Sequence, residues 1–124
     1  MATPLERDIA TLEGQGVALR PHPQTDGWTF LVLAGWPLGP HFNRPSAELL
    51  LKIPPTYPFA GLDMFWTDPD VRLADGRMPA NTSVEQALGR SWLRFSWHPS
   101  TWRQGVDNLL TYLAFVDRRL HTGG

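Results

Sequence analysis

Residues 53–59 read IPPTYPF, and this stretch decides how the chain on either side of it folds. Its three prolines exclude a central strand or a helix, because proline lacks a backbone donor and has a fixed φ angle. Such a stretch is typical of a rigid structural loop, in which an X-Pro bond can be cis. We expect Tyr57 and Phe59 to clamp this loop to the core.

Extended segments lie before and after this loop. Apolar runs separated by turn residues are typical of strands, and they occur at 17–23, 28–36, 47–53 and 62–66. The connections are short, and Asp26-Gly27 is suited to the first hairpin turn. We therefore predict a four-stranded antiparallel meander. The middle strands are apolar on both faces, so a helix should cover at least one face of the sheet.

Apolar periodicity predicts a helix near each end of the chain. A capping box with proline at the first helical position, Thr3 to Glu6, opens a helix over 3–13. An apolar stripe from Gly105 to Leu120 predicts the second helix, with Thr101 as its cap. Between the last strand and this helix, residues 66–104 are rich in turn signals and tryptophan, and we expect a long irregular segment that carries function. The predicted fold class is α+β.

Composition indicates one folded domain over residues 1–124. Hydrophobic residues make up 42% of the chain and charged residues 19%, as in globular proteins. The net charge is −1 and the basic residues are scattered, so we expect no nucleic-acid partner. There is no apolar run long enough to span a membrane and no secretory signal, which favours a cytoplasmic protein.

Neither a metal nor a cofactor is expected. The chain has no cysteine, which excludes disulfides and thiolate metal sites. Its four histidines are dispersed without the spacing of metal ligands. Gly35 and Gly39 lie in a proline-rich hairpin rather than at the start of a helix, so there is no phosphate-binding loop.

This order of elements resembles the ubiquitin-conjugating enzyme (UBC) fold. Two motifs carry the resemblance over nearly the whole chain: PPTYPF at 54–59, and WRQG at 102–105 ahead of the second long helix. The stretch GRSWLRFSWHPSTWRQGVDNLLTYLAFV at 89–116 is similar to the divergent bacterial branch of that superfamily, which occurs beside ubiquitin-activating-like and deubiquitinase-like proteins. The resemblance implies a ubiquitin-like protein and a ubiquitin-activating-like enzyme as partners. Non-catalytic relatives share the Tyr-Pro loop, so it indicates fold more strongly than activity.

The chain departs from the family at the catalytic position. Typical members have a His-Pro-Asn tripeptide and then a cysteine that carries the ubiquitin-like protein as a thioester, a short segment before the tryptophan that leads into the second helix. Here there is no cysteine, and the nearest equivalent of the tripeptide, Met78-Pro79-Ala80-Asn81, lacks the histidine. Ser96 lies six residues ahead of Trp102, nearest to where the family's nucleophile is expected.

Ser96 and His98 therefore form a candidate nucleophile and base. A serine hydroxyl can relay an acyl group as an oxyester when a base takes its proton. On an extended segment, residues i and i+2 face the same side, so His98 could act on Ser96. Asn81 could donate to the oxyanion if the long segment folds back. Alternatively, the pair only satisfies local polar groups beneath the aromatic residues Phe95 and Trp97.

Three interpretations stay open at this point. The first is an acyl-transfer enzyme of a bacterial ubiquitin-like conjugation pathway. The second is a catalytically inactive UBC-like scaffold that binds a ubiquitin-like protein or an activating enzyme. The third is a chain whose catalytic cysteine has been replaced.

Two local patterns have structural interpretations. Thr82 or Ser83 followed by the run Val84 to Leu88 predicts a short capped helix. The C-terminal pair Gly123-Gly124 matches the end of ubiquitin-like proteins, but a helix that stops near Leu120 also needs a glycine just beyond it.

Overall fold

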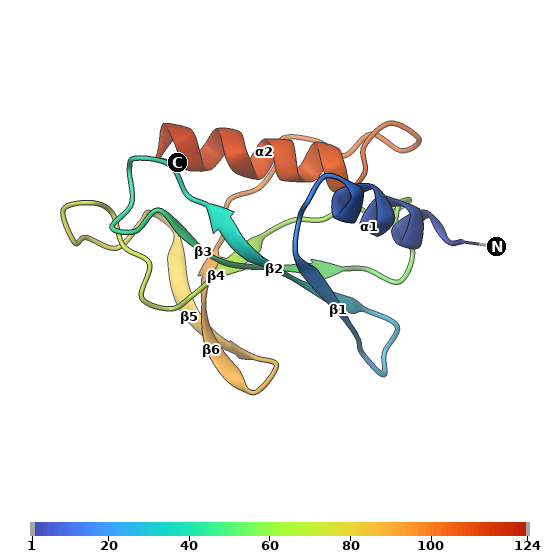
Figure 1. Ribbon diagram of the computed structural model, residues 1–124, viewed down its shortest axis with the longest axis horizontal. Helices are drawn as coiled ribbons and strands as arrows, with labels where there is room; N and C mark the ends of the chain where they lie inside the picture. The colour runs from blue at the N-terminus through green and yellow to red at the C-terminus, as the bar shows by residue number, and fades with distance from the viewer. Residues whose placement is uncertain (1, 124) are drawn as a thin grey trace.

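The structure of the protein is a computed structural model that describes residues 2–123. Within this range, six strands form one antiparallel sheet in the order β1-β2-β3-β4-β6-β5. Both helices lie over the same face of that sheet (Figure 1). Along the chain the elements are α1 (Pro4–Gly14), β1 (Leu19–Pro23), β2 (Thr29–Pro37), β3 (Ser46–Ile53), β4 (Phe65–Thr67), β5 (Thr82–Ala87), β6 (Arg90–Phe95) and α2 (Leu109–Thr122).

The α+β class is confirmed, but the four-stranded meander is only part of the sheet. β1 to β4 are neighbours in sequence and in space, as predicted. Beyond β4 the sheet continues through the β5–β6 hairpin, which lies inside the segment expected to be irregular. Residues Val84 to Ala87 therefore belong to strand β5, and the predicted short helix is wrong.

The turn of this hairpin explains why the sequence did not predict it. Leu88 and Gly89 both have positive φ angles, 51° and 74°. Two-residue hairpin turns of this kind match the twist of the flanking strands, and they are usually signalled by Asn-Gly or Asp-Gly. Leucine rarely adopts the left-handed region, so Leu88-Gly89 carries no turn signal.

The two predicted helices are present, and only the second starts at a different residue. Thr3 and Glu6 form the expected capping box of α1. α2 is capped by Asn108 rather than Thr101, because the Asn108 side chain accepts from the backbone N–H of Thr111 at 3.0 Å. Gly123 ends α2 in the left-handed conformation expected of a C-cap, while Gly124 lies outside the described residues. No helix within residues 2–123 combines the length and the apolar character needed to cross a bilayer.

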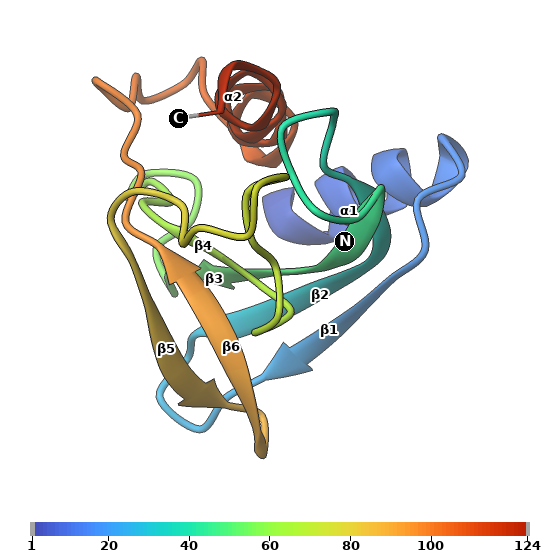
Figure 2. The same ribbon diagram turned by 90° about the vertical axis from the view of Figure 1, so that its left-hand side faces the viewer.

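The main core lies between the sheet and the two helices. Along β6, Leu93 and Phe95 point into this core, whereas Trp92 belongs to a smaller cluster on the outer face of the sheet. Trp66 and Leu50 from β4 and β3 complete most of that outer cluster. The sheet is thus apolar on both faces, with the helices covering one of them, as the apolar middle strands predicted (Figure 2).

Tyr57 ties the proline-rich loop to both helices. Its hydroxyl donates to the Asp8 carboxylate of α1 and accepts from the backbone N–H of Leu109 at the start of α2, 2.6 Å away. Burial and the hydrogen bond to Asp8 raise the pKa of Tyr57. The Tyr57–Pro58 bond is cis. Phe59 is 69% exposed, so the expectation that it clamps the loop to the core is wrong.

Trp102, the first residue of the WRQG motif at 102–105, contacts the same loop. Its indole Nε1 donates to the carbonyl oxygen of Pro58 at 2.9 Å. The ring lies so close to Gly61 that a Cβ atom there would come within 2.4 Å of it. The two motifs that suggested the fold are therefore in direct contact.

Candidate functional site

The segment that follows β6 carries two of the predicted site residues. Phe95 and Trp97 are buried, whereas Ser96 is partly exposed and His98 is exposed. Ser96 and His98 thus stand on either side of the buried Trp97, which fits the alternation of side chains expected along an extended backbone. Trp97 holds the segment in place, since its ring packs edge-on against Phe95 with centroids 4.9 Å apart and its Nε1 donates to the carbonyl oxygen of Ala80 at 2.8 Å.

The loop before β5 folds back onto this segment and brings Asn81 beside Ser96. The backbone N–H of Ser96 donates to the carbonyl oxygen of Asn81 at 3.0 Å. Asn81 has a φ of 57°, a left-handed conformation that asparagine tolerates better than most residues. Its side chain is exposed, and its amide forms no hydrogen bond to any residue in 2–123. Asn81 thus meets Ser96 through the backbone, and its amide is available to a ligand.

His98 pairs with a carboxylate that the sequence analysis did not single out. Its Nδ1 lies 2.5 Å from Oδ1 of Asp63. A carboxylate accepts, so Nδ1 carries the hydrogen and Nε2 of the neutral ring is left as an acceptor. The side chains are 52% and 67% exposed, so the pair contributes little to stability, and its main effect is to orient the imidazole.

Only the fold connects these two residues. Asp63 comes just before β4 and His98 just after β6, and β4 pairs with β6 in the sheet. The two residues are 35 positions apart in the sequence, so no local pattern points to Asp63 as a partner of His98. Knowing that β4 and β6 are neighbours would have been enough to place Asp63 near His98.

The Ser96 hydroxyl has no hydrogen-bond partner among the described residues. It forms no hydrogen bond to His98 or to any other residue in the range 2–123. Catalytic hydrogen bonds are often loose in the absence of substrate and close when it binds. The arrangement therefore places a serine hydroxyl, an oriented imidazole and a free amide on neighbouring segments, without a hydrogen bond between the hydroxyl and the imidazole.

Comparison with known proteins assigns the chain to a family. The family model of Prokaryotic E2 family E matches residues 5–123. The chain belongs to this family. No curated protein and no solved structure matches it. The resemblance to the bacterial branch of the UBC superfamily is thereby confirmed, and the chain is an E2-like protein of a ubiquitin-like conjugation pathway.

A cleft of about 330 Å³ opens in this E2-like protein where the segment after His98 reaches α2. Figure 2 shows that segment rising past the edge of the sheet to the level of α2. Tyr112 lines the cleft and donates its hydroxyl to the carbonyl oxygen of Met64 at 2.8 Å. Burial, and then the nearby charge of Asp63, raise the pKa of Tyr112. Tyr112 therefore lies both in the cleft and near Asp63, the partner of His98.

The described part of the E2-like protein offers no metal centre. Within residues 2–123 there is no group of three histidine or carboxylate side chains that could hold a metal ion.

Proposed function

We propose that this E2-like protein carries a ubiquitin-like protein as an oxyester on Ser96. As the Ser96 oxygen attacks the activated C-terminal carbonyl carbon of the ubiquitin-like protein, Nε2 of His98 takes the hydroxyl proton. The Asn81 amide donates to the oxyanion. When the intermediate collapses, the bond to the activating enzyme breaks and the leaving group receives the proton from His98.

The observation that supports this proposal most is the hydrogen bond of Asp63 to Nδ1 of His98, which is exposed two residues after the partly exposed Ser96. A serine is a weak nucleophile unless a base accepts its proton, and a base works best when a third group fixes its orientation and tautomer. In typical UBC enzymes the cysteine comes between the Tyr-Pro loop and the second long helix, and Ser96 occurs in the same interval of this chain, which supports the proposal.

A fluorophosphonate probe tests the nucleophile without any partner protein. Such a probe phosphonylates a serine whose proton is taken by a base, with loss of fluoride. We expect peptide mass spectrometry to find the label on Ser96. The Ser96→Ala variant should lose it, and His98→Ala should react at least about tenfold more slowly. Ser100→Ala is the matched control, because Ser100 is exposed on the same segment and should not affect labelling.

The complete reaction tests the proposed function itself. The protein is mixed with the ubiquitin-like protein and the activating enzyme of the same organism, with ATP. We expect an adduct that resists thiols, is cleaved by hydroxide and is absent from Ser96→Ala. The proposal is wrong if activation proceeds and the wild-type chain forms no such adduct.

A second candidate function, an inactive binding module, is favoured by a different surface. Phe59 is 69% exposed and Val106 is 56% exposed. Val106 and Pro58 border one hollow that Arg7 of α1 also lines. Phe59 follows Pro58 directly in the chain, and exposed apolar side chains beside a hollow are typical of protein-binding surfaces.

The two functions predict opposite results for two variants. If the chain is a binding module, Phe59→Asp weakens binding to the activating enzyme and lowers pathway output, while Ser96→Ala leaves the output unchanged. If Ser96 carries the acyl group, Ser96→Ala abolishes the output while binding to the activating enzyme is retained.

A further inference from the structure

The cleft along α2 carries more positive than negative charge. Its charged lining residues are Arg103, Asp107 and Arg118. The Asp107 carboxylate already accepts hydrogen bonds from a neighbouring residue of the same loop. The backbone N–H of Arg103 donates to it at 2.7 Å, and the Arg103 guanidinium donates to it at 3.4 Å. These hydrogen bonds lower the pKa of Asp107, so its carboxylate stays ionised and remains bonded to Arg103.

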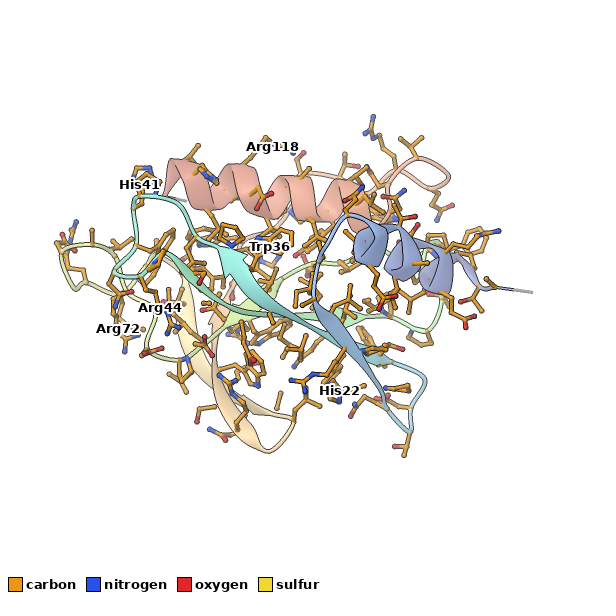
Figure 3. The ribbon with its side chains drawn as sticks, viewed as in Figure 1. His22, Trp36, His41, Arg44, Arg72 and Arg118 are labelled. Carbon is orange, nitrogen blue, oxygen red and sulfur yellow. The ribbon has the colours of Figure 1, made fainter. Side chains whose placement is uncertain are left out.

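Arg118 has no partner of opposite charge in the described residues. It forms no hydrogen bond and no ion pair within 2–123, and Figure 3 shows it on the side of α2 away from the sheet. The nearest carboxylate in sequence, Asp117, accepts from the Trp36 indole instead, at 3.0 Å. The Arg118 guanidinium is thus available at the rim of the cleft.

Arg119 adds a positive charge close to Phe115, one of the residues that line the cleft. Its guanidinium carbon lies 5.1 Å from the centroid of the Trp97 ring and 5.7 Å from that of Phe115. Its Nε is buried without a hydrogen-bond partner among the described residues. Phe115 also lines the cleft, together with the two arginines Arg103 and Arg118.

The opposite wall is a chain segment rather than a helix. Residues 99–103 contribute the hydroxyls of Ser100 and Thr101 and the ring of Trp102. A volume of about 330 Å³ is at the lower end of the range for small-ligand sites, and it suits a few side chains of an extended peptide better than a folded surface.

We propose that this cleft binds an extended acidic segment of a partner protein. A carboxylate of that segment pairs with Arg118, and a neighbouring apolar side chain packs on Phe115 and Trp102. Guanidinium groups bind carboxylates through two parallel hydrogen bonds, which favours Asp and Glu over neutral residues. The same charges disfavour a basic segment. The inference stands independently of whether Ser96 is a nucleophile.

Nuclear magnetic resonance of the full chain tests the proposal with two synthetic peptides of equal length. One is Ser-Asp-Leu-Glu-Gly and the other Ser-Lys-Leu-Lys-Gly. We expect the acidic peptide to shift the amide signals of Thr111, Phe115 and Arg118 and the indole signal of Trp102, in a saturable way. The Trp28 indole is the internal control, because it lines a separate hollow with Lys52 and Trp66.

Two charge-reversal variants complete the test. Arg118→Glu should weaken the affinity for the acidic peptide at least about tenfold, because an attraction becomes a repulsion. Arg20→Glu makes the same charge change on β1 and should leave the affinity unchanged. Equal binding of both peptides, or unchanged affinity in Arg118→Glu, overturns the proposal. Ser96→Ala should bind the acidic peptide normally, which separates failure of this inference from failure of the proposed function.

Discussion

The proline-rich loop at 54–61 and the segment at 96–101 are both irregular and both contain aromatic residues, but the fold uses them differently. In the loop, the Tyr57 hydroxyl bonds to both helices, and Gly61 lies directly against the Trp102 ring. In the segment, Trp97 is the buried anchor, whereas His98 points outward and bonds to an exposed carboxylate.

This difference indicates that the two regions contribute unequally to stability. A buried hydroxyl that satisfies a backbone N–H cannot be lost without leaving that donor unpaired, which is costly. An exposed imidazole–carboxylate pair contributes little to stability, so its position can serve a reaction instead. We therefore expect changes in the loop to alter the free energy of unfolding and changes in the segment to alter reactivity.

The largest expected effect is loss of folding at alkaline pH. The chain has two tyrosines, Tyr57 and Tyr112, and burial raises the pKa of both above the ordinary 10.0. The unfolded chain releases these protons near pH 10, while the folded chain keeps them. Their contribution to stability is therefore complete below pH 10 and is lost as the pH rises above it.

Tyrosinate absorbance and circular dichroism, followed together through an alkaline titration, check this expectation. Tyrosinate should appear only as the helical signal disappears. Ionisation of either tyrosine in the folded chain near pH 10 would contradict the tight burial of the loop and of α2.

Next in size is the effect of Gly61→Ala. The added Cβ would lie 2.4 Å from the Trp102 ring, which is a severe steric clash. The ring and the segment behind it must move, and we expect the free energy of unfolding to fall by about 2–4 kcal/mol. Urea denaturation measures this change. Gly14→Ala is the matched control, because a Cβ at Gly14 meets nothing within 4 Å, and it should leave the free energy of unfolding unchanged or raise it slightly.

A smaller loss is expected for Tyr57→Phe. The variant removes the hydroxyl that accepts from Leu109 N–H and donates to Asp8, so a buried donor is left unpaired. We expect about 1–3 kcal/mol of destabilisation in urea. Tyr112→Phe offers a comparison, since it leaves only the Met64 carbonyl without that donor. An equal or larger loss for Tyr112→Phe would mean that the Tyr57 hydroxyl in the loop stabilises the fold no more than the Tyr112 hydroxyl on α2 does.

The smallest effect on stability is expected for Asp63→Asn. Both partners of this pair are exposed, so the free energy of unfolding should change by less than about 1 kcal/mol. An asparagine amide can donate to Nδ1 of His98, which would place the ring hydrogen on Nε2 and block its action as a base. Fluorophosphonate labelling of Ser96 should then slow at least about tenfold.

Nitrogen-15 resonance of the His98 ring reports the tautomer directly. A change of tautomer together with unaltered stability would support a positioning role for Asp63. Unaltered labelling of Ser96 in Asp63→Asn would show that the imidazole is not held by this carboxylate for reaction.

Most helices and strands could be predicted from the sequence because each is specified by residues that are close together along the chain. The capping box at Thr3 and Glu6, the apolar strand runs and the stripe along the last helix all depend on residues a few positions apart. The β5–β6 hairpin was missed because Leu88 takes a left-handed conformation that its side chain does not signal. The start of α2 was misplaced because Thr101 and Asn108 are both residues that cap helices, and only Asn108 reaches the N–H of Thr111.

The candidate site divides in the same way. The amino-acid sequence by itself determined that Ser96 and His98 could share one face, because alternation along an extended segment is a local property. It also determined the family, whose model matches residues 5–123. Only the tertiary structure decided that Asp63 bonds to His98 and that Asn81 lies against Ser96, because pairing of β4 with β6, and of β5 with β6, joins residues that are distant along the chain.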